Sequence, residues 1–488
     1  MARYDLCILG GGSAGIAAAV RAHDLGRSVA LVVAGPLGGA GVWNGALSSK
    51  TLWHLAMDYA RGRRGDRGYR GGDLALVWDD VCAQVAGACG EAEALVAHEL
   101  AFLAGPGPGG VGRVEVVRGR GRFVAADAIE VRDDGGAAPR RLEAARFLIA
   151  TGSRPRALDG VVVDGDRVVT SDQIERCGPP PARVAIVGAG VVGCEYATVL
   201  ASFGATAVEL IDRAPRILPF EDEDVSAAIT ASFEGLGVLV HREARLDDLA
   251  VDDDGVTLTI RQGDAVTRRR VDRVLLSIGR VPATDDLGLE LAGVARDARG
   301  SIVTAADDHT RTTAPHVWAA GDVTADLMLA NVAELEGRHA VEDMFGHAPP
   351  PLRYDAQSAI LFLRPEVATV GLGEQLARQR GVPYRAATVA NRLIRRFGAM
   401  RATAGFVKLL ARPDGRLLGL RMVGPQASSA IQGVALLIER GGTLEELERC
   451  MHPHPAVTEG VQEAARLLLG TSMFSPAAFP DDVRVTSG

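Results

Sequence analysis

The segment DLCILGGGSAG, residues 5–15, decides the fold of the first part of this chain. Residues 4–9 form an apolar run that predicts a strand, and the glycines after it predict a tight turn. Residues 14–25 are rich in alanine and predict a helix, and residues 28–33 predict a second strand. This order is the opening βαβ unit of a dinucleotide-binding fold.

The same order recurs at residues 183–212, where the sequence RVAIVGAGVVG begins a second unit. Residues 183–187 predict its first strand, residues 192–203 its helix and residues 207–211 its second strand. Both turns follow the spacing GxGxxG, which lets backbone N–H groups approach a pyrophosphate at the start of the helix. One match is a weak signal, but two matches in the same context predict two nucleotide sites. The residues expected to hold phosphates are Gly10, Gly12, Ser13, Ala14 and Gly15 in the first turn and Gly188, Gly190, Val192 and Gly193 in the second.

A carboxylate at the end of the second strand of such a unit normally binds the adenosine ribose. The second unit supplies Asp212, which favours NAD over NADP. The adjacent Arg213 would partly accommodate a 2′-phosphate and tempers that preference. The first unit ends in Val33, so its ribose is held in another way or the site binds less tightly.

Bulk composition excludes several classes of protein. The chain has 488 residues, enough for two to four domains, and its net charge of −8 gives no field for attracting nucleic acid. No stretch predicts a signal peptide or a membrane span, so we expect a cytoplasmic protein. The six cysteines show no disulfide or metal-ligand spacing; we expect buried thiols and no metal site.

Lysine is rare in this chain. Only Lys50 and Lys408 occur among 53 basic residues, and all the others are arginine. Such a bias suggests that each lysine is retained where the planar guanidinium of arginine would not serve.

Three further motifs, Ala150-Thr151-Gly152-Ser153, Gly279-Arg280-Val281-Pro282 and Ala320-Gly321-Asp322-Val323, complete an ordered set. With the two glycine turns, they make the chain resemble the class I pyridine nucleotide-disulfide oxidoreductases over residues 4–470. Dihydrolipoamide dehydrogenase, mercuric reductase and glutathione reductase are members of this family. The resemblance implies an α/β fold with two Rossmann-like domains, a C-terminal α+β dimerisation domain, and a homodimer.

The implied domains are an FAD-binding domain in two segments, 1–155 and 280–348, an NAD(P)-binding domain at 156–279, and a dimerisation domain at 349–470. Within them, residues 114–147 alternate like antiparallel strands, and residues 428–439 predict an amphipathic helix. Residues 471–488 are rich in proline and small residues and predict an extended arm or a disordered tail.

The resemblance also implies individual roles. Asp322 would bind ribityl or phosphate oxygens of FAD, Leu329 and Ala330 would lie by its ring, and Lys50 would sit near flavin N5 and pair with Glu195 beside the nicotinamide. His454, oriented by Glu459, matches a histidine that in relatives acts as an acid-base residue at the cysteines of the partner subunit. Further residues of the implied cofactor sites are Thr151, Gly152, Gly279, Arg280 and Gly321.

The segment GGAGVWNGALSSK, residues 38–50, departs from the family. It resembles GGTCLNVGCIPSK, whose two cysteines form the disulfide that passes electrons to a thiol or disulfide substrate. Gly41 and Ala46 stand at those positions, and neither can carry thiolate chemistry. Trp43 and Asn44 would fill the vacated space or form a wall of an acceptor pocket. His454 would then protonate another acceptor, such as a quinone oxygen, or serve in packing.

These residues predict an enzyme in which NADH, preferred over NADPH, reduces FAD. The reduced FAD then reduces a small non-disulfide acceptor. A quinone, a dye, oxygen or a second pyridine nucleotide would qualify. A different reading is a non-catalytic member that binds nucleotides for a structural or regulatory role, which Val33 and the missing cysteines would suit. A disulfide reductase that uses Cys450 near His454 is a third and weaker reading, because the cysteine has no partner at a suitable spacing.

Overall fold

The computed structural model describes the whole chain except residues 1–2, 69–73, 107–111, 134, 137 and 325. The fold separates into two compact units. The first contains residues 1–55, 75–179 and 278–352, and the second contains residues 56–74, 180–277 and 353–488. Helix α2 (Ala46–Gly62) passes from residues of the first unit to residues of the second.

The first unit is built on a sheet with the strand order β3-β2-β1-β6-β5-β4, in which β17 also pairs with β6. The pairs β1–β2, β1–β6, β2–β3 and β6–β17 are parallel, as the βαβ pattern predicts. The pairs β4–β5 and β5–β6 are antiparallel. The strands are β1 (Arg3–Leu9), β2 (Ser28–Val33), β3 (Arg113–Arg118), β4 (Arg120–Ala125), β5 (Ala128–Arg132), β6 (Arg140–Ile149) and β17 (Val317–Ala319).

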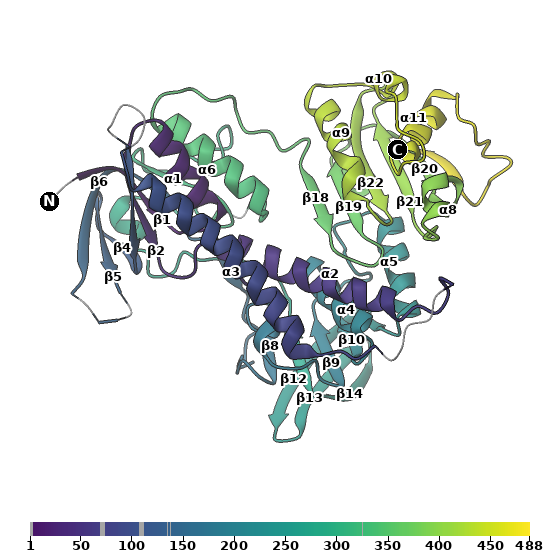
Figure 1. The fold of residues 1–488 in the computed structure, drawn as a ribbon, viewed down its shortest axis with the longest axis horizontal. Coiled ribbons are helices and arrows are strands. Elements are labelled where there is room, and N and C mark those ends of the chain that lie inside the picture. The colour runs from purple at the N-terminus through teal and green to yellow at the C-terminus, as the bar shows by residue number, and fades with distance from the viewer. Residues whose placement is uncertain (1–2, 69–73, 107–111, 134, 137, 325) are drawn as a thin grey trace. The chain divides into compact units, whose positions relative to one another are not determined.

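Apolar cores lie on both faces of this sheet. On one face, helices α1 (Ser13–Asp24), α3 (Trp78–Leu103) and α6 (Ala330–Met344) cover the strands, and α1 packs against α6 (Figure 1). On the other face, Phe123 and Phe147 are fully buried with an edge-to-face contact. The remaining elements of this unit are short: η1 (Gly39–Gly41), β7 (Ser153–Pro155), β8 (Val168–Thr170), η3 (Ile174–Arg176), β16 (Arg280–Pro282) and η4 (Leu289–Ala292).

The second unit contains the second βαβ pattern. Strands β11 (Leu239–His241), β10 (Ala207–Ile211), β9 (Arg183–Val187) and β15 (Arg273–Leu276) lie in that order and pair in parallel. Helix α4 (Val191–Phe203) packs against β9 and β10, and helix α5 (Glu223–Gly235) packs against β11. A separate antiparallel sheet joins β12 (Ala244–Asp252), β13 (Gly255–Gln262) and β14 (Ala265–Val271).

A third, antiparallel sheet in the second unit has the order β18-β19-β22-β21-β20-β23. Its strands are β18 (Ser358–Leu361), β19 (Val367–Gly371), β20 (Arg385–Ala390), β21 (Phe406–Ala411), β22 (Leu417–Val423) and β23 (Val483–Ser487). Helix α9 (Ser428–Glu439) contacts β19 and β22, and α11 (Glu459–Leu469) contacts β20 and β21. The shorter helices are α7 (Glu374–Gln379), η5 (Asn391–Leu393), α8 (Arg395–Ala399) and α10 (Leu444–Arg449).

The mixed α/β fold and the C-terminal α+β sheet confirm the predicted fold class. One local expectation is wrong. Strand β3 lies within the stretch expected to be antiparallel but pairs in parallel with β2, because strand alternation does not reveal the direction of a partner. The tail is an arm that ends in an ordered strand, since β23 pairs with β20 along the edge of the sheet.

The cysteines only partly match the expectation of buried thiols. Cys7, Cys89 and Cys194 are buried, and burial raises the pKa of each thiol. Cys82 and Cys177 are partly accessible, and Cys450 is exposed. Of the helices within the described parts of the chain, none combines the length and apolar character needed to cross a bilayer.

Candidate functional site

The first glycine turn has the geometry of a phosphate cradle. Gly10 has φ +118°, and a Cβ on it would lie 2.1 Å from the carbonyl oxygen of Ala150. A Cβ on Gly15 would lie 1.9 Å from the carbonyl oxygen of Gly10, so the helix can approach the turn only with glycine there. A Cβ on Gly12, in contrast, would meet nothing within 4 Å. Gly12 therefore faces open space at the start of α1.

The start of α1 has no side-chain cap. Its first N–H groups are therefore available to an anion, which is what a pyrophosphate at this turn would need. Val33 is buried at the end of β2, and its methyl groups would lie 2.9 Å from a Cβ on Gly11. Val33 thus packs under the turn, and the end of β2 offers a ribose no carboxylate.

The second glycine turn repeats this construction. Gly188 has φ +106°, and a Cβ on Gly193 would lie 1.9 Å from the carbonyl oxygen of Gly188. A Cβ on Gly190 would again meet nothing within 4 Å, and α4 also starts without a side-chain cap. The two turns therefore share a first glycine with positive φ, an open second glycine and a third glycine with no room for a Cβ. These backbone features fit a dinucleotide phosphate at each turn.

Asp212 lies at the second turn, as predicted. Its Oδ2 accepts a hydrogen bond from the Ala189 N–H at 2.5 Å, and its Oδ1 accepts one from the Ala214 N–H at 2.7 Å. These bonds fix the carboxylate beside the turn, where a ribose-binding acid is needed. Arg213 is exposed next to it. The carboxylate of Asp212 is thus fixed at the turn, whereas the guanidinium of Arg213 extends into solvent.

The expected FAD residues at the ends of β6 and β17 form one hydrogen-bonded network. Asp322 accepts a hydrogen bond from Ser153 Oγ at 2.5 Å, and Ser153 Oγ in turn accepts one from Arg280 Nε at 2.7 Å. Thr151 Oγ1 donates to the carbonyl of Ala283 at 2.8 Å. Strands β7 and β16 pair antiparallel beside these bonds, so the motifs of residues 150–153 and 279–282 are held together.

Sequence reasoning missed Ser153 and Glu336 as parts of this network. Glu336 is fully buried, and its Oε2 accepts a hydrogen bond from the Gly321 N–H at 2.6 Å. Ser153 therefore holds the side chain of Asp322, and Glu336 holds the backbone of the preceding residue, Gly321. Leu329 precedes the first residue of α6, Ala330, and no side chain caps that helix. What distinguishes Glu336 from the other acids of α6 is its complete burial, and burial cannot be seen in the sequence.

The segment of residues 38–50 is anchored by polar contacts within the first unit. Trp43 Nε1 donates to Glu93 at 3.0 Å, and Asn44 Oδ1 accepts from Arg176 at 2.8 Å. The Arg176 guanidinium lies 6.0 Å from the centre of the Trp43 ring, and Cys89 Sγ lies 3.3 Å from the Val42 carbonyl oxygen. Glu93, Arg176 and Cys89 lie far from the loop in sequence, and sequence reasoning did not find them.

Two glycines determine how this segment turns. A Cβ on Gly45 would lie 2.1 Å from the Ala40 carbonyl oxygen, and a Cβ on Gly41 would lie 2.7 Å from Ser13 Oγ. Helix α2 begins at Ala46, and Lys50 is half-buried one turn along it with Nζ 3.3 Å from Ser49 Oγ. The sequence contains no cysteine between Cys7 and Cys82. The described loop therefore has backbone and indole contacts in place of a thiol pair.

Glu195 is buried on α4, and its Oε1 accepts a hydrogen bond from the Phe362 N–H at 2.9 Å. Glu195 and Lys50 belong to different units, and their pairing stays a prediction. His454 Nδ1 lies 2.6 Å from Glu459 Oε1, which is the orientation that the sequence predicts. The His454 side chain is 62% exposed, while the neighbouring His452 is half-buried and burial lowers its pKa. The contact with Glu459 thus engages Nδ1 of His454 and fixes the orientation of its ring.

Comparisons with known proteins agree with this geometry. Residues 4–337 match the family described as pyridine nucleotide-disulphide oxidoreductase, and residues 357–465 match its dimerisation domain. The chain is 33% identical over 474 residues to dihydrolipoyl dehydrogenase of Geobacillus stearothermophilus, with 96% of each chain covered. It is 31% identical over 468 residues to the mitochondrial dihydrolipoyl dehydrogenase of Schizosaccharomyces pombe, covering 94% of this chain and 89% of the relative.

A solved structure shows the same architecture. The crystal structure of LpdA from Mycobacterium tuberculosis is similar with a TM-score of 0.86 at 28% identity, covering 95% of this chain and 99% of LpdA. The residues matched by the family contain both glycine turns, the Asp322 network and strands β18 to β22 of the C-terminal sheet. The protein is therefore an oxidoreductase that belongs to the pyridine nucleotide-disulphide oxidoreductase family, whose members bind FAD and NAD(P).

Proposed function

We propose that this protein oxidises NADH with bound FAD and delivers the electrons to a small acceptor that is not a disulfide. The observation that carries the proposal is the loop of residues 38–50, which has no cysteine and is anchored by Trp43 and Asn44. Dithiol chemistry needs two thiols in reach of each other, and the nearest cysteines in sequence are Cys7 and Cys82. The relatives named above are dihydrolipoyl dehydrogenases, so the acceptor is the point of difference.

The cofactor residues support a working donor side. Gly10, Gly12 and Gly15 would hold the FAD pyrophosphate, and Asp322 its ribityl or phosphate oxygens. Gly190 and Asp212 would hold the pyridine nucleotide, with NADH preferred because a carboxylate disfavours a 2′-phosphate. FAD, when bound, supplies the exchange between hydride from a nicotinamide and electrons for the acceptor. Lys50 and Glu195 would position the reacting faces, which is a role for a compact cation and an acid.

The dimerisation domain supports a homodimer. In such a dimer, His454 would serve the partner's acceptor site, with Glu459 fixing its tautomer through the 2.6 Å contact. A quinone-like acceptor takes up protons on reduction, and Nε2 of His454 would supply one. A second pyridine nucleotide as the acceptor would not need this histidine, so its retention favours a quinone-like acceptor.

An anaerobic titration tests the proposal directly. Without an active disulfide, a single equivalent of NADH should bleach the flavin completely, because the flavin is then the only two-electron acceptor in the protein. NADPH should be less effective at equal concentration. The measurement is the flavin absorbance band of the purified holoenzyme during stepwise addition, followed by a screen of quinones, dyes and NAD analogues. Flavin that NADH cannot reduce would favour the alternative of a non-catalytic nucleotide-binding protein. Val33 is consistent with that alternative, because it leaves the first site without a ribose-binding carboxylate.

A second test restores the cysteines. We expect the double variant Gly41→Cys with Ala46→Cys to show no lipoamide or glutathione disulfide reduction above background. A side chain at position 41 would press on Ser13 Oγ at 2.7 Å, and the Trp43 and Asn44 anchors hold the loop in its present path. The measurement is NADH oxidation with each disulfide, with the single variant Ala46→Cys as the control. Disulfide turnover by the double variant would show that the loop still supports dithiol chemistry.

A further inference from the structure

The second lysine of the chain, Lys408, is a fully buried cation in the middle of β21. Its Nζ lies 2.7 Å from Asp222, 2.7 Å from Asp224 and 2.9 Å from Glu374. These carboxylates come from the starts of α5 and α7. Their oxygens lie within 4.8 Å of one another, and the ammonium of Lys408 is the cation among them.

The geometry explains why this position is a lysine. An ammonium is compact and has three N–H donors, one for each carboxylate, whereas a guanidinium is planar and forked. Burial by itself would lower the pKa of Lys408, but the charges of Asp224 and Asp222 outweigh it and raise that pKa. Lys408 is therefore charged, and its pairing holds the segment of residues 221–224 on the sheet.

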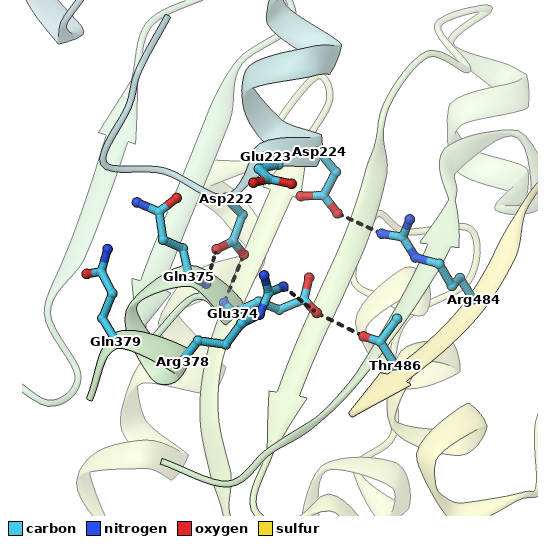
Figure 2. Close-up of a pocket in the computed structure, with 9 residues that line it drawn as sticks. All are labelled: Asp222, Glu223, Asp224, Glu374, Gln375, Arg378, Gln379, Arg484 and Thr486. Carbon is cyan, nitrogen blue, oxygen red and sulfur yellow. Dashed lines mark hydrogen bonds and ion pairs between the residues drawn. The ribbon is translucent and has the colours of Figure 1, made fainter. Parts of the chain in front are cut away.

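Figure 2 shows how this acidic segment meets α7 and β23. Asp222 accepts hydrogen bonds from the N–H groups of Glu374 and Gln375 at 3.1 and 2.9 Å. Asp224 pairs with Arg484 at 3.0 Å, and Thr486 donates to Glu374 at 2.9 Å. A cavity of about 400 Å³ lies beside these residues. The C-terminal strand thus closes one side of the cluster.

The same segment leads back to the second glycine turn. Leu218 is fully buried with φ +47°, a conformation that non-glycine residues rarely adopt. Its N–H donates to the carbonyl of Ala189, inside the turn, at 2.8 Å. Glu221 donates its N–H to the Leu218 carbonyl at 3.0 Å, and the Glu221 carboxylate pairs with buried Arg421 at 2.9 Å. A strained residue stays in place only when its surroundings hold it.

We propose that Lys408 is a positioning residue for the pyridine nucleotide: by fixing Asp222 it holds Leu218 against Ala189 and keeps the second glycine turn in its binding geometry. The inference rests on the proposed function in that this turn is taken to bind NADH. The path runs from Lys408 Nζ to Asp222, through the three residues 219–221 to Leu218, and by one hydrogen bond to Ala189. Lys408 contacts no nucleotide in this scheme and acts through the backbone alone.

The test uses the flavin-loaded protein with Lys408→Arg and Lys408→Met. We expect the dissociation constant for NAD+, which binds without reducing the oxidised flavin and is measured by calorimetry, to rise by about tenfold or more in both variants. FAD content should not change, because the first glycine turn belongs to the other unit. Hydrogen exchange of the peptide containing Leu218 should accelerate by about tenfold in both variants, because the Leu218 N–H bond to Ala189 is lost more often. The control is Arg392→Ala, which breaks an ion pair between η5 and Asp482, the residue before β23, but does not touch residues 216–224.

The outcomes are separable. Slower or unchanged exchange at Leu218 with unchanged NAD+ affinity would overturn the inference and leave Lys408 a purely structural residue, even if the melting temperature falls. If Lys408→Met does not fold, Asp222→Asn, which keeps the other two carboxylates on Lys408, takes its place in both measurements. If the wild-type protein does not bind NADH, the proposed function fails, and the exchange rate at Leu218 still decides whether Lys408 holds the turn.

Discussion

Replacing Gly15 by alanine is expected to destroy the FAD-binding fold and yield protein without flavin. The added Cβ would lie 1.9 Å from the Gly10 carbonyl oxygen and 3.0 Å from its carbonyl carbon. These are backbone atoms at the crossing of β1 and α1, so no side-chain rotation can relieve the clash. Overpacking of a core typically costs about 1–3 kcal/mol, and a backbone clash belongs at the upper end of that range or beyond it. This is a large part of the stability of a domain.

Gly12→Ala is the matched control for this variant. A Cβ on Gly12 meets nothing within 4 Å, so the flavin-free protein should fold normally and unfold at the same urea concentration as wild type. Its flavin affinity should still fall, because the methyl group would occupy the space that a pyrophosphate needs. The measurements are the ratio of flavin to protein absorbance after gel filtration and the urea midpoint of flavin-free protein. A wild-type flavin ratio in Gly15→Ala would contradict the proposed role of the turn.

Replacing Lys50 by methionine is expected to slow flavin reduction by NADH on the order of 10²-fold, the usual effect of removing one preorganised charge from a reacting centre. Methionine keeps the length and flexibility of the side chain, so the half-buried site stays filled while the positive charge is lost. Lys50→Arg should recover only part of the rate, because a planar guanidinium does not reproduce a compact ammonium. The measurement is the rate of flavin bleaching after anaerobic rapid mixing with NADH.

The control for Lys50 lies on the same helix. Arg61→Met removes a cation from α2 whose side chain is 70% exposed and whose pairing partner, Asp58, is equally exposed. An exposed pair of this kind contributes little, so neither flavin reduction nor stability should change. Equal rates of flavin reduction in wild type and Lys50→Met would remove Lys50 from the donor side. The proposal would then rest on Glu195 and the glycine turns alone.

Local elements could be predicted because their signals are local. Strands β2, β9 and β10 and helix α9 have the bounds that the sequence predicts, since a glycine turn or an apolar period marks each end. The pairing partner of a strand, in contrast, could not be predicted from such local signals. β3 alternates like an antiparallel strand but pairs in parallel with β2, and the tail, predicted as an extended arm or a disordered segment, ends in β23, which pairs with β20. Both pairings depend on which edge of a sheet is open, and that is a property of the folded chain.

The candidate site divides in the same way. Asp212 follows its strand directly, so the sequence places it at the turn, and the 2.5 Å bond to Ala189 agrees. Glu459 follows His454 by five residues, and the 2.6 Å contact again agrees. The partners of Trp43 and Asn44, which are Glu93 and Arg176, come from a helix and a short turn far along the chain. No spacing rule connects such residues, because packing decides which side chains meet.

The amino-acid sequence by itself determined the two phosphate turns, the acid at the second turn and the absence of cysteine from residues 8–81, because each depends on residue type and short spacing. It also marked Lys408 as unusual without indicating a role. Only the tertiary structure decided which residues surround Lys408: Asp222 and Lys408 are far apart in the chain, and three carboxylates converge on one ammonium only when α5 and α7 pack against β21. A buried charge is stable only with such partners, and folding alone brings them together.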